Sequence, residues 1–157
     1  MRAAILLGLM LSAATHAADS LQEAMAELQP SSLAVAAQRA ELAWFAEAGK
    51  PFAGTQVRVI SERIPTHWYE ANVLAPLFSR LTGIRVIHEV SGEDDVVNKL
   101  RTQQETGLPL YDAYVSDSDL IGQHFRDGQV LVLSDFMAGE GATVTSPTLD
   151  LADFIGL

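Results

Sequence analysis

Three stretches decide the fold of this chain: Val57-Arg58-Val59-Ile60, Ile84-Arg85-Val86-Ile87-His88-Glu89-Val90 and Tyr111-Asp112-Ala113-Tyr114-Val115. Runs rich in Val, Ile and Tyr are typical of β-strands. Two segments with helical spacing of apolar residues separate them, residues 65–83 and residues 93–107. Strands that alternate with helices indicate the α/β class, with a mostly parallel sheet and helices on both faces.

The regions around these stretches give further expectations. Pro76 lies inside the helix predicted for residues 65–83 and is expected to kink it, because proline lacks the amide proton that a helix interior needs. Residues 120–125 are predicted to form a short helix, and Val130-Leu131-Val132-Leu133 a short strand. From Ser134 onward the sequence predicts loops and short helical turns.

Residues 18–53 show helical patterns only, without the strand patterns of the later residues. They are predicted to form a helical N-terminal arm packed on residues 54–157. Asp19 or Ser20 can cap a first helix that Pro30 ends. Ser31 or Ser32 can cap a second, alanine-rich helix, which ends at Gly49.

Residues 1–17 have the pattern of a cleavable secretory signal peptide. Arg2 is followed by an apolar run from residue 3 to residue 11 and then by small residues that end at Ala17. The apolar run is shorter than the roughly 20 residues that span a bilayer. We therefore expect cleavage after Ala17 and a periplasmic protein without an integral membrane segment.

Composition excludes several classes of function. The chain has 20 acidic and 10 basic residues and a net charge of −10 at pH 7. Such a surface repels nucleic acid and anionic lipid, so no nucleic-acid partner is expected. There are no cysteines, which excludes disulfides, cysteine–zinc sites and thiol nucleophiles.

Polar segments follow each predicted strand. They are Ser61-Glu62-Arg63, Ser91-Gly92-Glu93-Asp94 and Ser116-Asp117-Ser118-Asp119. Parallel α/β sheets bind small ligands at the carboxyl ends of their strands. Together with an aromatic side chain that could stack on a sugar ring, these segments predict a site for a polyhydroxy or cationic solute. The candidate ligand-binding residues are Ser61, Glu62, Trp68, Ser91, Asp117 and Ser118.

More ordinary roles remain open for several of these residues. Ser118 or Asp119 could cap the helix that follows, and Trp68 could pack at a helix start. His67, His88 and His124 lack the short spacing of a zinc site. No Gly-x-Ser-x-Gly or phosphate-binding motif occurs. We therefore expect no catalytic residue, no metal and no cofactor.

Residues 50–157 resemble the bacterial extracellular solute-binding proteins (family 1) of ABC importers. The resemblance rests on ordered motifs: residues 50–62, Thr66-His67-Trp68-Tyr69-Glu70, residues 74–86, residues 92–100, residues 111–122 and residues 149–156. The last three are closest to the branch that binds glycerol or sugars. The resemblance implies a type II periplasmic-binding-protein-like fold with two lobes, in which the solute binds between the lobes and the closed form docks on a membrane permease.

Members of that family are several hundred residues long, so the resemblance implies that residues 54–157 are an incomplete N-terminal lobe and that the chain is truncated. The function expected is the periplasmic solute-binding component of an ABC importer for a polyol or sugar, with no enzymatic activity. Two alternatives stay open. One is an exported acidic α/β hydrolase, and the other is a non-catalytic interaction protein that uses the helical arm.

Overall fold

The computed structural model describes residues 19–115, 121–126, 128 and 130–151. The predicted signal peptide and the candidate residues Asp117 and Ser118 lie outside this part of the chain. Among the described residues, no helix combines the length and the apolar composition needed to cross a membrane.

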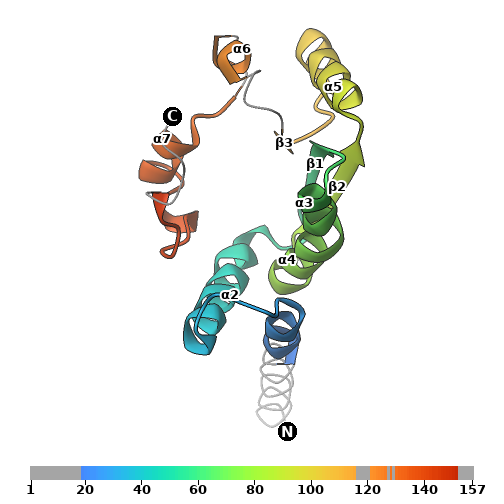
Figure 1. Ribbon diagram of the computed structural model, residues 1–157. Coiled ribbons are helices and arrows are strands. Elements are labelled where there is room, and N and C mark those ends of the chain that lie inside the picture. The colour runs from blue at the N-terminus through green and yellow to red at the C-terminus, as the bar shows by residue number, and fades with distance from the viewer. Residues whose placement is uncertain (1–18, 116–120, 127, 129, 152–157) are drawn as a thin grey trace, which may run out of the picture.

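The centre of the fold is a three-stranded parallel sheet (Figure 1). Its strands are β1 (Gln56–Glu62), β2 (Arg85–Ser91) and β3 (Ala113–Val115), in the order β2-β1-β3. Each matches one of the three stretches predicted from the sequence. In the register of β1 and β2, Glu62 lies beside Ser91. The α/β class with a parallel sheet is confirmed.

Helices cover both faces of the sheet. On one face, Ile60 of β1 packs against Val96 and Leu100 of α5 (Glu93–Thr106). On the other face, α4 (Ala75–Thr82) lies against β2, where the backbone amide of Val86 donates to Ser79 Oγ. Parallel strands must be joined by crossover connections. Because these crossovers are right-handed, a connection that moves to one side along the sheet and the next one that moves back lie on opposite faces.

Pro76 perturbs its helix by changing the helix type in the preceding turn. The helical segments α3 (Pro65–Tyr69), η2 (Glu70–Leu74) and α4 follow one another without a break, and η2 is a π-helix. Because proline has no amide proton and its ring clashes with the carbonyl four residues earlier, the wider π turn relieves both problems.

The helical arm packs on α4, as predicted. Its first helix covers residues 19–27 and its second, α2, covers Val35–Gly49. Ala24 and Met25 from the first helix, Leu42 from α2 and Leu77 from α4 form one buried cluster. The prediction that Ser31 or Ser32 caps α2 is wrong, because Ala34 occupies that position. Ser31 Oγ instead accepts a hydrogen bond from the Leu33 amide.

The C-terminal part contains α6 (Ile121–Arg126), α7 (Leu133–Ala138) and the 3-10 turn η4 (Ala142–Val144). The helix predicted for residues 120–125 is confirmed over its described residues, 121–125, whereas the strand predicted for residues 130–133 is wrong. Leu131 and Val132 have no regular structure and α7 begins at Leu133. A strand forms only where a neighbour supplies hydrogen bonds, and no described strand lies beside this segment.

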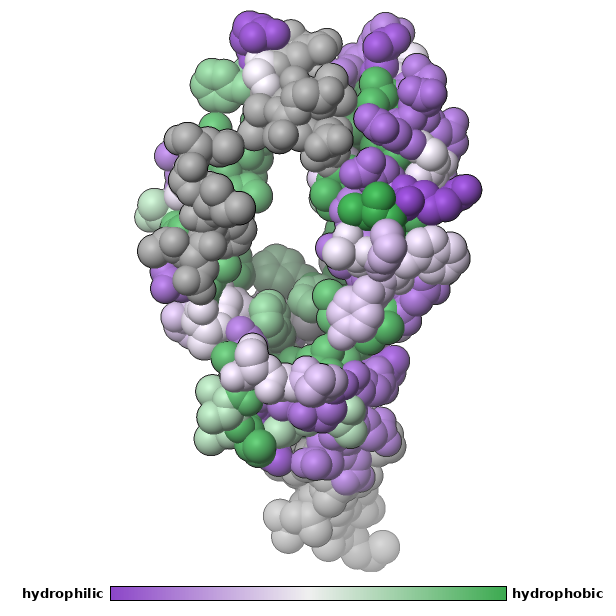
Figure 2. Space-filling view, in the orientation of Figure 1, coloured by the Kyte–Doolittle hydropathy of each residue, from purple (hydrophilic) through white to green (hydrophobic). Residues whose placement is uncertain are grey.

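Residues 131–151, which follow α6, stand apart from the sheet and return to the arm. Figure 2 shows an opening through the molecule, with the sheet and α5 on one side and α7 on the other. Thr148 Oγ1 donates a hydrogen bond of 2.6 Å to Glu41 of α2, far away along the chain. This separation leaves Leu131 and Leu133 each 64% exposed.

Candidate functional site at the carboxyl edge of the sheet

The carboxyl ends of the strands meet at one edge, because all three strands are parallel. β1 ends at Glu62, β2 at Ser91 and β3 at Val115. From β1 the chain crosses to β2, and from β2 it crosses back over β1 to β3. The two connections therefore leave β1 on opposite sides, which makes the position between β1 and β3 a switch point of the sheet. In α/β sheets a ligand crevice forms outside the carboxyl ends of the strands at such a switch point.

Glu62 and Ser91 are brought together at this edge. They are register partners on adjacent parallel strands, so their side chains are on the same face, the one covered by α5. Glu62 is partly exposed and Ser91 is 8% exposed. The Ser91 hydroxyl donates to Asp95 Oδ2 at 2.6 Å in the first turn of α5. Ser91 therefore offers its lone pairs to a ligand but no free proton.

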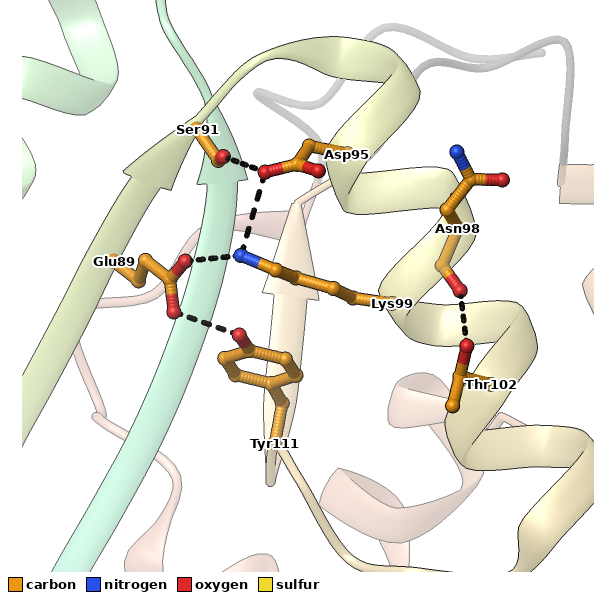
Figure 3. A network of polar contacts seen from close by, with 7 residues as sticks. All are labelled: Glu89, Ser91, Asp95, Asn98, Lys99, Thr102 and Tyr111. Atoms are coloured by element: carbon orange, nitrogen blue, oxygen red, sulfur yellow. Dashed lines mark hydrogen bonds and ion pairs between the residues drawn. The ribbon is translucent and has the colours of Figure 1, made fainter.

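A polar network supports this part of the edge (Figure 3). Lys99 Nζ lies 3.4 Å from Asp95 Oδ2 and 2.5 Å from Glu89 Oε1, and the Tyr111 hydroxyl donates to Glu89 Oε2 at 2.7 Å. The hydrogen bond from Lys99, followed by that from Tyr111, lowers the pKa of Glu89. The hydrogen bond from Ser91 lowers the pKa of Asp95. The network joins β2, α5 and the segment before β3, and it fixes Asp95 and Ser91 in place.

Ser61 lies on the opposite face of the sheet from Glu62, since side chains alternate along a strand. It is fully buried, and its Oγ is 2.7 Å from His88 Nε2 of β2. Burial lowers the pKa of His88, while the carboxylate of Glu70 acts in the opposite direction. Sequence reasoning assigned no serine–histidine pair. The signal that could have found it was register, because both residues project from the same face of neighbouring strands.

Trp68 lies in α3, the helix that follows β1, and is 53% exposed. The preceding residue, His67, is 6% exposed, and its Nδ1 donates to the Glu62 carbonyl at 2.9 Å. This bond ties the start of α3 to the end of β1. The backbone of Trp68 is therefore held close to the end of β1, and its side chain is exposed.

The structure divides the predicted site residues into three groups. Glu62 and Ser91 lie side by side, and Trp68 is exposed on the adjoining helix. Ser61 is turned away from them and is buried with His88. Asp117 and Ser118 lie outside the described residues. Within the part of the chain that the structure describes, no group of three His, Asp or Glu side chains is arranged to hold a metal ion.

A second feature is a pocket of about 280 Å³ on the α5 face of the sheet. It lies beside the Lys99–Glu89 ion pair, and none of the predicted site residues lines it. Its lining residues are Arg58, Val59, Ile87, Glu89, Lys99, Leu110 and Tyr111. The charged groups in it already have partners, since Arg58 donates to the Pro109 carbonyl and Lys99 to Glu89.

Comparison of the chain with models of known protein families, with curated proteins and with solved structures found no match.

Proposed function

We propose that this chain is the periplasmic solute-binding component of an ABC importer for a polyol or sugar. In this proposal the α/β unit is part of the N-terminal lobe of a type II periplasmic-binding-protein-like fold, and a membrane permease is its partner. The observation that carries the proposal is the sheet order β2-β1-β3, with Glu62 and Ser91 side by side at its carboxyl edge. The ordered motifs of residues 50–157 also support it.

The chemistry of this edge suits a ligand rich in hydrogen-bond donors. The Glu62 carboxylate accepts hydrogen bonds from hydroxyl groups, and bonds to a charged acceptor are about twice as strong as neutral ones. Ser91 offers only lone pairs, since its proton is committed to Asp95. The exposed indole of Trp68 offers a flat apolar surface for a sugar ring. Asp117 and Ser118, which follow β3 in the sequence, are proposed to complete the site.

The Ser61–His88 pair is the observation that favours the alternative, an exported hydrolase. A nucleophilic serine needs a histidine base within hydrogen-bond reach, and the distance of 2.7 Å meets that requirement. However, Ser61 is 0% exposed, so a substrate carbonyl cannot reach its oxygen in this structure. The other alternative, an interaction protein, uses the apolar face of the arm, which is already packed on α4. Solute binding therefore accounts for more of the observations.

The proposal is tested by titrating the protein with glycerol and common sugars while recording amide NMR spectra. We expect saturable binding with a dissociation constant of about 1 mM, because a site that is open on one side encloses only part of a ligand. Signals of Glu62, Trp68 and Gly92 should shift. Glu62→Gln should weaken binding about tenfold or more, since hydrogen bonds to charged groups contribute about 1.5–3 kcal/mol.

Glu105→Gln is the matched control, because Glu105 is an exposed glutamate at the far end of α5. It should leave the affinity unchanged. The absence of saturable shifts with every polyol and sugar, or equal effects of the two substitutions, would contradict the proposal.

Export of the chain is tested separately. Expressed from Met1 in a Gram-negative host, the protein should be recovered from the periplasm with Ala18 as its first residue, because the peptidase recognises small residues such as Thr15 and Ala17. Intact-mass measurement of the periplasmic fraction identifies the new terminus. Recovery of the unprocessed chain from the cytoplasm alone would contradict this part of the proposal.

A further inference from the structure

We propose that the pocket on the α5 face of the sheet binds a small carboxylate with an apolar body, and that the Arg58 guanidinium holds the carboxylate group. The pocket has a volume of about 280 Å³. This is the space of about nine water molecules at roughly 30 Å³ each, so the ligand is small, such as benzoate or a short branched acid. Neither Glu62 nor Ser91 lines the pocket, so the proposal does not rest on the proposed function.

Apolar surface predominates in the wall of the pocket. Ile87 of β2 lines it, together with Leu110 and Tyr111 from the segment before β3. Ile87 is 38% exposed, and Leu110 and Tyr111 are half-buried. A ligand with an apolar body would remove this surface from water, which is a favourable change.

The wall at Tyr111 is held in place without the help of the Arg58 side chain. The Tyr111 amide donates to Gln103 Oε1 at 2.7 Å, and Gln103 Nε2 donates to the Tyr111 carbonyl at 3.1 Å. The Tyr111 hydroxyl donates to Glu89 (Figure 3). The Asp112 amide donates to the Arg58 carbonyl at 2.8 Å. The pocket is therefore formed before a ligand arrives, which reduces the ordering that binding must cause.

The pocket offers few hydrogen-bond acceptors. Glu89 is the one carboxylate among its lining residues, and both of its oxygens already accept a hydrogen bond, Oε1 from Lys99 and Oε2 from Tyr111. These two bonds lower the pKa of Glu89, so its carboxylate is ionised and its charge is balanced by Lys99. An ammonium or hydroxyl group of a ligand would have to compete with these partners. The pocket therefore disfavours a cation.

Arg58 supplies unused hydrogen-bond donors. A guanidinium carries five N–H groups, and within the described residues only Nη2 of Arg58 donates, to the Pro109 carbonyl at 2.5 Å. Asp112 Oδ2 lies 3.6 Å from Arg58 Nε, which is an ion-pair distance but too long for a hydrogen bond. These contacts orient the guanidinium and leave N–H groups for a ligand carboxylate, which arginine binds through two parallel hydrogen bonds.

Benzoate is the probe that tests the proposal, and benzamide is its matched control, because it has nearly the same shape without the charge. The whole chain is titrated with each compound at fixed salt concentration while amide NMR spectra are recorded. We expect benzoate to cause saturable shifts at Ile87, Leu110 and Tyr111, with a dissociation constant of about 1–10 mM. The affinity is low because Asp112 partly offsets the charge of Arg58. Benzamide should bind about tenfold more weakly or less, since hydrogen bonds between charged groups are the stronger ones.

Arg58→Gln should raise the dissociation constant for benzoate about tenfold or more, because the charge-assisted hydrogen bonds are lost. The variant should keep the fold, since the backbone bonds between Arg58 and Asp112 and the two bonds from Gln103 to Tyr111 do not use the Arg58 side chain. Arg101→Gln is the matched control, because Arg101 is an exposed arginine of α5 that does not line the pocket. It should leave the affinity unchanged.

The proposal is overturned if benzoate causes no saturable shifts, if benzamide binds as tightly as benzoate, or if the two arginine variants bind benzoate equally well. Saturable shifts confined to Glu62 and Gly92 would overturn it too, since the carboxylate would then bind at the carboxyl edge. If Arg58→Gln does not fold, the comparison of benzoate with benzamide on the unchanged chain decides. Each of these results is independent of whether glycerol or a sugar binds.

Discussion

Replacing Ile60 by alanine is expected to lower the free energy of unfolding by about 2–5 kcal/mol, the usual cost of truncating a buried aliphatic side chain. Ile60 is 0% exposed in the central strand and packs against Val96 and Leu100 of α5. The substitution removes apolar contacts and leaves a cavity that the strand cannot easily fill, because strands on both sides hold it in place. Urea denaturation followed by circular dichroism measures the loss.

Ile87→Ala is the matched control. Ile87 projects from the same face of the sheet but belongs to the edge strand β2 and is 38% exposed. Its truncation removes less buried surface, so we expect a clearly smaller loss of stability. An equal loss for the two variants would mean that Ile60 is not at the centre of the core.

Substituting valine for Gly49 is expected to destabilise the contact between the arm and α4 by about 1–3 kcal/mol, the typical cost of overpacking. A Cβ atom at Gly49 would lie 2.5 Å from Thr82 Cβ and 3.1 Å from Thr82 Cα, so the backbone of α4 or α2 must move. Limited proteolysis should cut the arm faster in this variant, and urea denaturation should show the loss of stability.

Gly92→Val is the control for this experiment. A Cβ atom at Gly92 would meet no atom within 4 Å, and the backbone there is extended with φ −68° and ψ 150°, which valine adopts readily. Gly92 is the N-cap of α5, where valine is less favourable than glycine, so we expect a loss of at most about 1 kcal/mol and no faster cleavage of the arm. Similar behaviour of the two valine variants would show that the close approach of Gly49 to Thr82 does not hold the arm.

The contrast between β1 and residues 130–133 shows where local pattern suffices and where it does not. Both contain several β-branched residues, and both predict strands. β1 forms because β2 and β3 supply hydrogen bonds on its two sides, whereas no strand among the described residues pairs with residues 130–133. The difference lies in the relative positions of segments distant in sequence, and no property of the four residues encodes it.

The candidate site illustrates the same distinction. That Glu62 and Ser91 share one edge followed from the sequence, because parallel strands joined by crossovers align their carboxyl ends. The sequence did not predict that Ser61 pairs with His88, nor that Ser91 is linked through Asp95 to Lys99. Each depends on the strand register and on how α5 lies over the sheet, and a shift of one residue would send every side chain to the other face.

The sequence by itself determined the α/β class, the three paired strands, the helical arm and the acidic, cysteine-free composition, because each depends on residue type and short-range spacing. Only the tertiary structure decided which of the polar residues face each other. In the tertiary structure Ser61 is buried, Trp68 is exposed and Gly49 lies against Thr82. These outcomes follow from packing between elements distant in sequence, where side chains compete for the same space and the same hydrogen-bond partners.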